Sequence, residues 1–419
     1  MRSLSVICFT ALAAAASVFA QDANATTTTG SSATTSASTT DSSSSSSSSD
    51  STIATATSTS SAATASGSST GSSTQGKVFQ RILQIWLENT DYETASTLPD
   101  YQALAAQGIL LNNTYAITHP SEPNYVAATG GSNFGIDNDD FYNIPANVST
   151  IFDLLENKGL QWKAYQEDLP SVGYTGFKAH NGSYVRKHNP AIIYDSIGLN
   201  ATRAANVVPA TQLATDIAAG NVPHWTFYTP NMTNDAHDTT AEFAGKWLTN
   251  FFNTTLSNKT FVDETLILVT FDENDTYPKA NRVWSLLLGA IPAASKNTTD
   301  GTFYTHYSSL STVEQNWDLG NLGRGDANKT LANVYSFVAS QIGYTNVAIA
   351  NGSSVSYFNE TIPGLLTNQS YNETHPSASA SGSGSASASA TGSTSGANGF
   401  TTSAVAVTIA SAVVAALML

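Results

Sequence analysis

Cysteine is nearly absent from this chain, since Cys8 is the one cysteine among 419 residues. Cys8 lies in a leader that we expect to be removed, so no disulfide bond holds the mature fold. Stability must therefore come from a hydrophobic core, and the middle of the chain is long enough to form one. Charged residues are also scarce, at 11%, and 31 acidic against 16 basic side chains give a formal net charge of −15. This balance argues against nucleic acid or another polyanion as a partner.

Both ends of the chain are hydrophobic, and each has the pattern of a targeting segment. Residues 1–20 carry one basic residue, Arg2, then an apolar run and the small-residue pattern Val18-Phe19-Ala20, which predicts a cleaved signal peptide. Residues 400–419 contain an apolar run with no Lys or Arg behind it, preceded by small residues. This pattern predicts a GPI-attachment signal, and hence an anchor at the cell surface or cell wall. A spanning helix is the alternative, but it needs about 20 apolar residues and usually basic flanks.

Two segments consist almost entirely of Ser, Thr, Ala and Gly, namely residues 21–76 and residues 374–399. They have too few apolar side chains to offset the entropy of ordering, so we expect disordered, O-glycosylated spacers, the second of which holds the anchor site. Residues 77–373 hold nearly all the aromatic residues and are expected to form one domain. This domain is rich in Asn-x-Ser/Thr glycosylation sequons. They include Asn112, Asn147, Asn181, Asn231, Asn274 and Asn328.

Short apolar runs alternate with amphipathic stretches through the domain. The runs predict β-strands, and the periodicity of the stretches predicts helices. The expected strands are residues 79–87, 161–165, 225–228, 265–271 and 283–288, and the expected helices are residues 98–106, 149–157 and 241–256. This succession predicts an α/β domain with a mostly parallel central sheet flanked by helices.

Three of the expected strands end in polar clusters. Glu88-Asn89 follows the first strand, residues 231–238 with Asp235 and His237 follow the third, and Asp272-Glu273 follows the fourth. Each cluster alone is more often a helix cap or a solvated loop. Together they are expected at one edge of the sheet, because ligands of open α/β sheets gather beyond the carboxyl ends of the strands.

Carboxylates and imidazoles gathered in this way favour a divalent metal ion. A cation there would let an acidic chain bind an anionic ligand, since the local field is set by the ion.

Residues 118–125 contain a further candidate site, Thr-His-Pro-Ser-Glu-Pro-Asn-Tyr, followed by Gly130. Pro123 suits the first turn of a helix that Gly130 would end, so Ser121 falls at or next to its N-cap. The free amides and dipole of a helix start favour a phosphate and a more acidic hydroxyl. The alternative is that Ser121 only caps the helix.

These segments resemble, in order, the motifs of the phosphoesterase family, which includes fungal secreted acid phosphatases and bacterial phospholipases C and is distantly related in fold to alkaline phosphatase. The matching segments are residues 82–89, 118–125, 187–190, 231–238, 270–273 and 305–308, with Glu314.

The resemblance implies that Ser121 is the nucleophile, ahead of Pro123 and Asn124. It implies metal or transition-state roles for Glu88, Asn89, Asp235, His237, Asp272, Glu273 and His306. The Asp-His pair typical of alkaline phosphatase appears here as Asp272-Glu273, so two zinc ions are not assumed.

The mechanism expected from these assignments is attack of Ser121 on the phosphorus of a small phosphate ester. His119 or His188 would protonate the leaving group or bind a phosphate oxygen, a role that an imidazolium fills best at acidic pH. A histidine beside a proline, as His119 is, can equally be structural.

The motifs of other hydrolase classes are missing from this sequence. It has no Arg-His-Gly segment, which phosphatases with a phosphohistidine intermediate carry, and no Gly-Asn-His-Glu segment, which dinuclear purple acid phosphatases carry. Residues 77–373 also lack the Gly-x-Ser-x-Gly elbow of the esterases. Two alternatives remain open, a phospholipase C-like phosphodiesterase and a non-catalytic cell-wall glycoprotein. The phosphodiesterase is disfavoured because phospholipases of the family typically continue from the acidic pair through a Gly-rich stretch to an Asp-His pair, whereas this chain has Asp275-Thr276-Tyr277-Pro278.

Overall fold

The computed structural model describes residues 74–350 and 362–369. The predicted signal peptide, almost all of the first spacer, the second spacer and the hydrophobic tail lie outside the described residues. Within the described ranges, no helix has both the length and the hydrophobicity needed to cross a bilayer.

The core of the domain is a nine-stranded sheet in which β11 pairs beside β2 and the other strands follow the order β10-β2-β9-β8-β1-β7-β3-β6. All neighbours pair in parallel except at β9, which runs antiparallel to β8 and β2. The mostly parallel α/β prediction is therefore confirmed. The strands are β1 (Arg81–Leu87), β2 (Ile109–Tyr115), β3 (Trp162–Gln166), β6 (Val207–Pro209), β7 (Trp225–Thr229), β8 (Thr265–Phe271), β9 (Arg282–Gly289), β10 (Thr298–Asp300) and β11 (Tyr304–Thr305). A separate hairpin joins β4 (Lys178–Ala179) and β5 (Tyr184–Val185).

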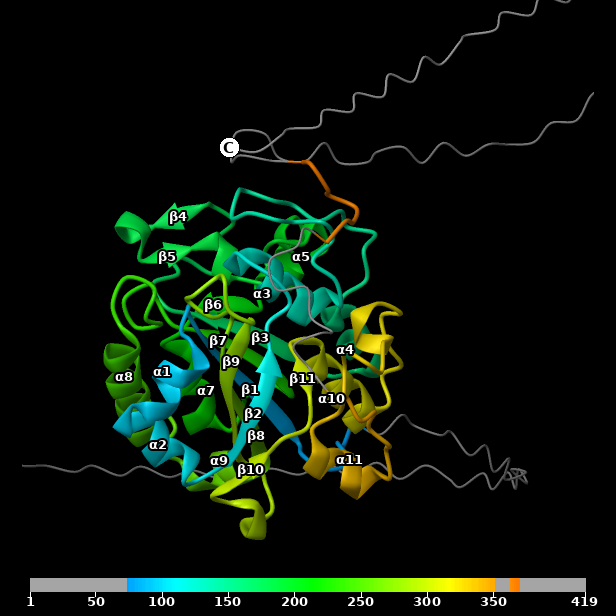
Figure 1. Cartoon of the computed structure of the whole chain (residues 1–419). Helices are drawn as coiled ribbons and strands as arrows, with labels where there is room; N and C mark the ends of the chain where they lie inside the picture. The colour runs from blue at the N-terminus through cyan, green and yellow to red at the C-terminus, as the bar shows by residue number, and fades with distance from the viewer. Residues whose placement is uncertain (1–73, 351–361, 370–419) are drawn as a thin grey trace, which may run out of the picture. The chain divides into compact units, whose positions relative to one another are not determined.

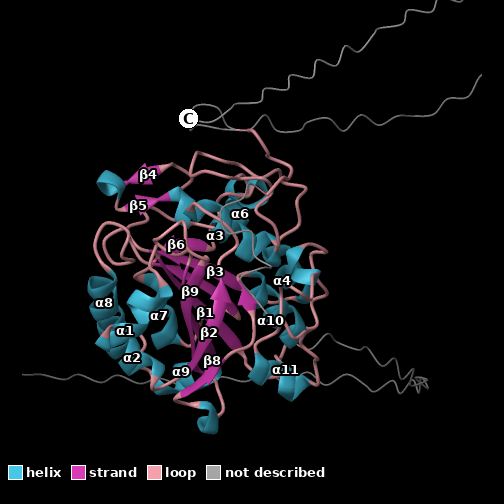
Figure 2. Ribbon diagram, in the orientation of Figure 1, coloured by secondary structure: helices cyan, strands magenta, loops and turns pink. Residues whose placement is uncertain are grey.

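Helices cover both faces of the sheet (Figures 1 and 2). One face carries α1 (Tyr92–Thr97), α2 (Pro99–Ala105), α7 (Gln212–Ala219), α8 (Ala241–Thr254) and α9 (Lys259–Glu264). The other carries α3 (Ser121–Gly130), α4 (Ile151–Lys158), α10 (Tyr307–Trp317) and α11 (Ser336–Ile342). Short elements complete the chain, namely α5 (Asp195–Gly198), α6 (Ala201–Ala204), and the 3-10 turns η1 (His180–Gly182), η2 (Arg186–His188), η3 (Ala293–Ser295) and η4 (Gly325–Ala327).

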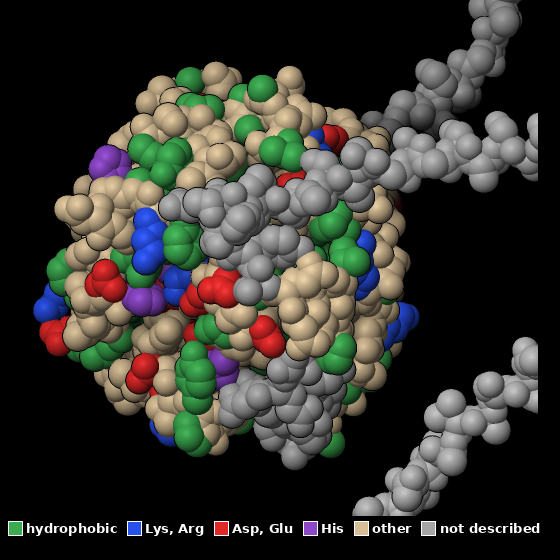
Figure 3. Space-filling view, turned by 90° about the horizontal axis from the view of Figure 1, so that it is seen from above, with side chains coloured by type: hydrophobic (Ala, Val, Ile, Leu, Met, Phe, Trp, Pro, Cys, Tyr) green, Lys and Arg blue, Asp and Glu red, His purple; other side chains and the backbone are tan. Residues whose placement is uncertain are grey.

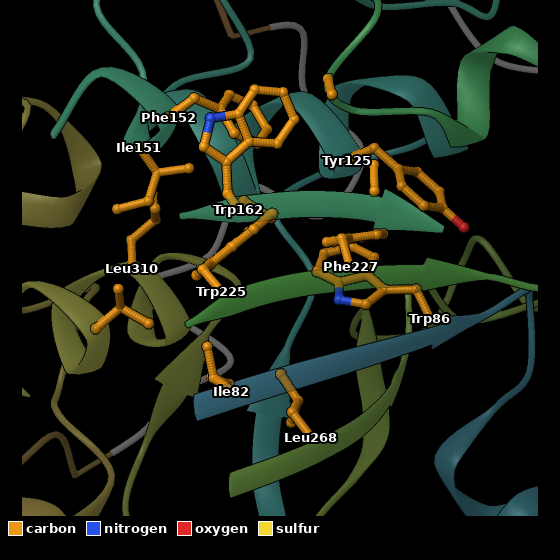
Figure 4. Packing of buried hydrophobic residues seen from close by; sticks show 14 of the residues in the cluster. Ile82, Trp86, Tyr125, Ile151, Phe152, Trp162, Trp225, Phe227, Leu268 and Leu310 are labelled. Carbon is orange, nitrogen blue, oxygen red and sulfur yellow. The ribbon is translucent and has the colours of Figure 1, made fainter. Parts of the chain in front are cut away.

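The central strands read as continuous apolar runs because each strand is buried on both faces. In β1, Ile82 and Trp86 join the cluster under α3 and α10, whereas Leu83, Ile85 and Leu87 join the cluster under α2 and α8. Figure 4 shows the first cluster, in which Trp86 packs beside Tyr125 of α3 and Phe227 of β7. This packing fixes α3 against the end of β1, where the candidate site lies.

Candidate active site

The strand order brings the three predicted polar clusters together. β1 pairs in parallel with β8 on one side and with β7 on the other, so the residues that follow these three strands meet at one edge. Glu88 follows the middle strand and is fully buried between Asp272, after β8, and Asp235, after β7. Figure 3 looks down on this end of the sheet, where acidic, basic and histidine side chains gather.

Pro120 takes the N-cap position of α3 without a capping side chain, and Ser121 is the first residue of the helix. The Oγ of Ser121 donates to Glu88 Oε2 at 3.0 Å. Tyr125, one turn along α3, donates its hydroxyl to Glu88 Oε1. Pro123 falls in the first turn, as predicted, and Gly131 in the left-handed conformation ends the helix one residue later than expected.

His119 packs against the acidic pair that follows β8. Its Nδ1 lies 2.5 Å from Glu273 Oε2, and its ring stacks on Tyr277 with centroids 3.9 Å apart. The backbone amide of Asn89 donates to Asp272 Oδ1 at 3.3 Å, which ties the end of β1 to the end of β8.

His188 occupies the other side of Glu88. Its Nε2 lies 3.3 Å from Glu88 Oε1, and its Nδ1 lies 3.6 Å from Asp235 Oδ2. One ligand atom from each of these three buried residues fits within 4.8 Å of the others, close enough to share a single metal ion. The sequence predicted His188 as a catalytic residue rather than as a possible ligand.

The electrostatics separate the two histidines. Burial lowers the pKa of His119 to about 4. Burial alone would also lower the pKa of His188, but Glu88 and Asp235 outweigh this effect and raise it above its usual value. Conversely, burial would raise the pKa of Glu88, but His188 brings it down to about 2.

The acidic pair is crowded by like charge. Burial, then repulsion from Glu88, raises the pKa values of Asp272 and Glu273 well above their usual range. Burial also raises the pKa of Asp235, to about 6.

Several buried acceptors in this cluster fit a divalent cation. Asp272 Oδ2, Glu273 Oε1 and Asp235 Oδ2 form no hydrogen bond among the described residues. The side-chain oxygen of Asn89 faces only acceptors, and the amide would have to be turned over to donate to Glu88 Oε2 and Asp272 Oδ1. Buried acceptors without donors are costly unless a cation neutralises them. The residues present therefore fit a metal ion of the hard or borderline class.

The remaining predicted site residues have visible partners. Asn124 Oδ1 accepts from the amides of Ile117 (2.9 Å) and Thr118 (3.2 Å), so it holds the loop before Ser121. The imidazole of His306 contacts the backbone oxygen of Asp272 at 2.5 Å, and burial lowers the pKa of His306 to about 4. His237 is more open, with Nδ1 at 3.0 Å from Asp238 Oδ1.

Sequence reasoning did not assign Tyr125, Asp139, Lys187 or Tyr277 to the site. Lys187 Nζ donates to Asp139 Oδ2 at 2.8 Å, and Asp139 Oδ1 accepts from the amide of Glu122 at 3.0 Å. Tyr125 and Lys187 stand within segments already singled out as motifs, which was the available signal. Asp139 lies in the acidic run 137–140, where composition alone does not distinguish it from a solvated loop.

A cavity of about 270 Å³ lies beside Asn89 and His237. A larger cavity, of about 930 Å³, opens at the opposite end of the strands near Arg81 and His224. The smaller cavity is the one at the site's end of the strands, since it is lined by Asn89 and His237, which are close to Glu88 and Asp235 in the sequence.

The predicted glycosylation sites differ in exposure. Asn147, Asn181 and Asn328 are exposed, whereas Asn112 and Asn231 are half-buried. Asn274 is only 1% exposed, and its Nδ2 donates to Asp91 Oδ1 at 3.2 Å and to the Thr276 oxygen at 2.8 Å. A glycan has no room there in the folded domain, so the prediction for Asn274 is corrected.

Residues 19–320 match the Phosphoesterase family, and the chain therefore belongs to this family. An acid phosphatase of Aspergillus fumigatus is 48% identical over 311 residues, which cover 73% of this chain and 68% of that protein. A phosphate-repressible acid phosphatase of Penicillium chrysogenum is 46% identical over 72% of this chain and 73% of that protein. Among solved structures, a Vibrio parahaemolyticus protein of the alkaline phosphatase superfamily aligns with a TM-score of 0.39 and 13% identity, over 60% of this chain and 70% of that one.

Proposed function

We propose that this chain is a secreted acid phosphatase that hydrolyses phosphate monoesters with Ser121 as its nucleophile. The observation that carries the proposal is the place of Ser121 Oγ, 3.0 Å from Glu88 Oε2, at the start of α3 and among buried carboxylates and histidines. The two relatives named acid phosphatase support the reaction class.

In the proposed reaction, Ser121 Oγ forms a bond to phosphorus while the bond to the leaving oxygen breaks. Water then cleaves the phosphoserine and releases inorganic phosphate. Glu88 orients Ser121 by accepting its hydrogen bond. The amides and dipole at the start of α3 favour the negative phosphoryl group.

A divalent cation next to Ser121 would be held by Glu88, Asn89, Asp272 and Glu273. Asp235 and His188 lie on the other side of Glu88 and would share it as a ligand. When bound, such a cation supplies positive charge that makes a nearby hydroxyl more acidic and stabilises phosphoryl oxygens. His306 supports this arrangement by contacting the Asp272 backbone oxygen.

His188 is better suited than His119 to give a proton to the leaving alkoxide. The carboxylates beside His188 raise its pKa and favour the imidazolium, whereas burial lowers the pKa of His119 to about 4 and favours the neutral ring. A proton held at His188 is lost as pH rises through its pKa, so we expect activity to fall at alkaline pH.

The chain's ends support a surface location, through the predicted signal peptide, two spacers and GPI signal. A phosphatidylinositol-specific phospholipase should release activity from intact cells, and truncation before Ser395 should give a soluble active enzyme. Activity that resists this phospholipase but yields to detergent would instead indicate a spanning tail.

Turnover of an aryl phosphate by the purified protein tests the function directly. We expect a maximum at acidic pH and loss of activity when elemental analysis confirms that the metal has been removed. If the metal-replete protein shows no turnover at any pH, the non-catalytic glycoprotein becomes the better interpretation.

A further inference from the structure

Lys187 places a positive charge near the carboxylates that surround the proposed nucleophile. It lies in η2, next to His188, and its side chain is only 12% exposed. Its Nζ donates to Asp139 Oδ2 at 2.8 Å and lies 3.5 Å from His237 Nε2. An ammonium has three donors, so the two partners seen among the described residues leave one for a ligand.

Asp139 links this ammonium to α3. Its Oδ2 accepts from Lys187, and its Oδ1 accepts from the amide of Glu122, the residue after Ser121. One carboxylate therefore holds both the lysine and the first turn of α3. A phosphoryl group on Ser121 would lie next to this pair.

The neighbouring arginine is committed elsewhere. Arg186 is buried and donates to the Tyr142 backbone oxygen and, at 2.6 Å, to Asn143 Oδ1. In contrast, the Lys187 ammonium faces the site, and its charge acts on Glu88, Asp272 and Glu273.

The ammonium of Lys187 is held in place by its ion pair with Asp139, in which Nζ lies 2.8 Å from Oδ2.

We propose that Lys187, positioned by Asp139, determines specificity for phosphate monoesters by binding a terminal phosphate oxygen that a diester lacks. This inference rests on the proposed function. A monoester has three terminal oxygens and a second ionisation near pH ~6, whereas a diester has two and carries a single charge. An ammonium at the third oxygen stabilises the dianion of the monoester, even at a pH below its second ionisation. A diester would instead place an uncharged ester group next to the ammonium.

Substitution of Lys187 tests the inference with two substrates that share one leaving group. These are p-nitrophenyl phosphate and bis(p-nitrophenyl) phosphate, assayed with saturating metal. For Lys187→Gln we expect kcat/KM on the monoester to fall about 10²–10³-fold, the range for loss of one charge-stabilising donor. The diester should change by less than about 3-fold, since it makes no such contact. Asp139→Asn should shift the ratio in the same direction by a smaller factor.

Lys163→Gln is the matched control, because Lys163 also pairs with an aspartate, Asp216, at 2.5 Å, but lies on β3 away from the cluster. It should leave the monoester-to-diester ratio unchanged. If Lys187→Gln does not fold, Lys187→Arg carries the test, since it keeps the charge for Asp139 but displaces the donor and should still lower the monoester rate selectively.

Equal losses on both substrates would overturn the specificity role and indicate a structural one, and unchanged rates would overturn the contact altogether. A wild-type enzyme that prefers the diester would overturn the proposed function itself. That result is visible before any variant is made, so the two failures are distinguishable.

Discussion

Ser121 Oγ donates to Glu88 Oε2 at 3.0 Å, which joins the first residue of α3 to the residue that follows β1. The serine hydroxyl is thus hydrogen-bonded to a buried carboxylate and not to the amides of its own helix. A serine that only caps a helix would bond to those amides, so this contact supports the nucleophile that we propose.

Replacing Ser121 with alanine should abolish turnover and leave the fold intact. The rate should fall by several powers of ten, the effect of losing a nucleophile. The lost hydrogen bond should cost only about 1 kcal/mol in the free energy of unfolding. Wild-type protein quenched in acid during turnover should carry phosphate on the peptide that contains Ser121. Ser311→Ala, at another buried serine, is the control, and phosphate trapped on histidine would contradict the assignment.

Asp272→Asn should separate metal binding from stability. It removes one charge from a crowded cluster, so the chelator-treated variant should melt at a higher temperature than chelator-treated wild type. With metal added, the variant should bind less by elemental analysis and lose activity by orders of magnitude. The exposed Asp263→Asn should change neither quantity. Full metal content and normal turnover in Asp272→Asn would remove Asp272 from the site.

The two histidines should respond differently to the leaving group. If His188 supplies the proton, His188→Gln should slow glycerol phosphate about 10²–10⁴-fold, the usual worth of acid catalysis, and p-nitrophenyl phosphate much less. His119→Gln should slow both substrates by a similar factor. Metal content must be measured alongside, because His188 also lies within reach of the candidate ion. The opposite pattern would assign the proton to His119.

Glu314 should make the domain less stable as pH rises. This buried carboxyl has its pKa raised to about 9 by burial, then by Asp326. The folded state favours its protonated form, so its stabilising contribution is complete below the unfolded pKa, near 4.5, and is lost as pH rises to about 9. Glu314→Gln should reduce the slope of unfolding free energy between those limits by up to about 1.4 kcal/mol per pH unit. Urea unfolding of chelated protein measures this, with the exposed Glu242→Gln as control, and an unchanged slope would rule out the effect.

Much of the sheet could be predicted because its central strands are apolar on both faces. The run predicted at residues 265–271 matches β8, and the run at residues 225–228 falls one residue short of β7. β2 was missed because Asn112 and Asn113 interrupt its apolar pattern at an irregular pairing with β9. Short strands such as β10 give too few residues for any periodicity to register.

The candidate site was predictable where residues follow strands and less so where loops fold back. Glu88 and Asp272 follow their strands directly, and Asp235 lies in the turn shortly after β7, so the parallel order of the strands brings them to one edge. Asp139 reaches the site from a long loop, and its position depends on tertiary contacts with Lys187 and the Glu122 amide. No local pattern encodes such a contact. The same reason explains the error at Asn274, whose sequon is visible in the sequence but whose burial is not.

The antiparallel direction of β9 also limits how this enzyme can change. β8 and β9 are adjacent in both sequence and sheet, so residues 272–281, which carry Asp272 and Tyr277, are anchored at both ends by paired strands. The amide of Asn274 donates to Asn281 Oδ1 at 2.9 Å and closes the loop on itself. The segments after β1 and β7 lead into helices, whereas this loop returns directly to the sheet. We therefore expect an insertion next to Asp272 or Asn281 to disturb the site more than an insertion at the exposed tip, residues 277–280.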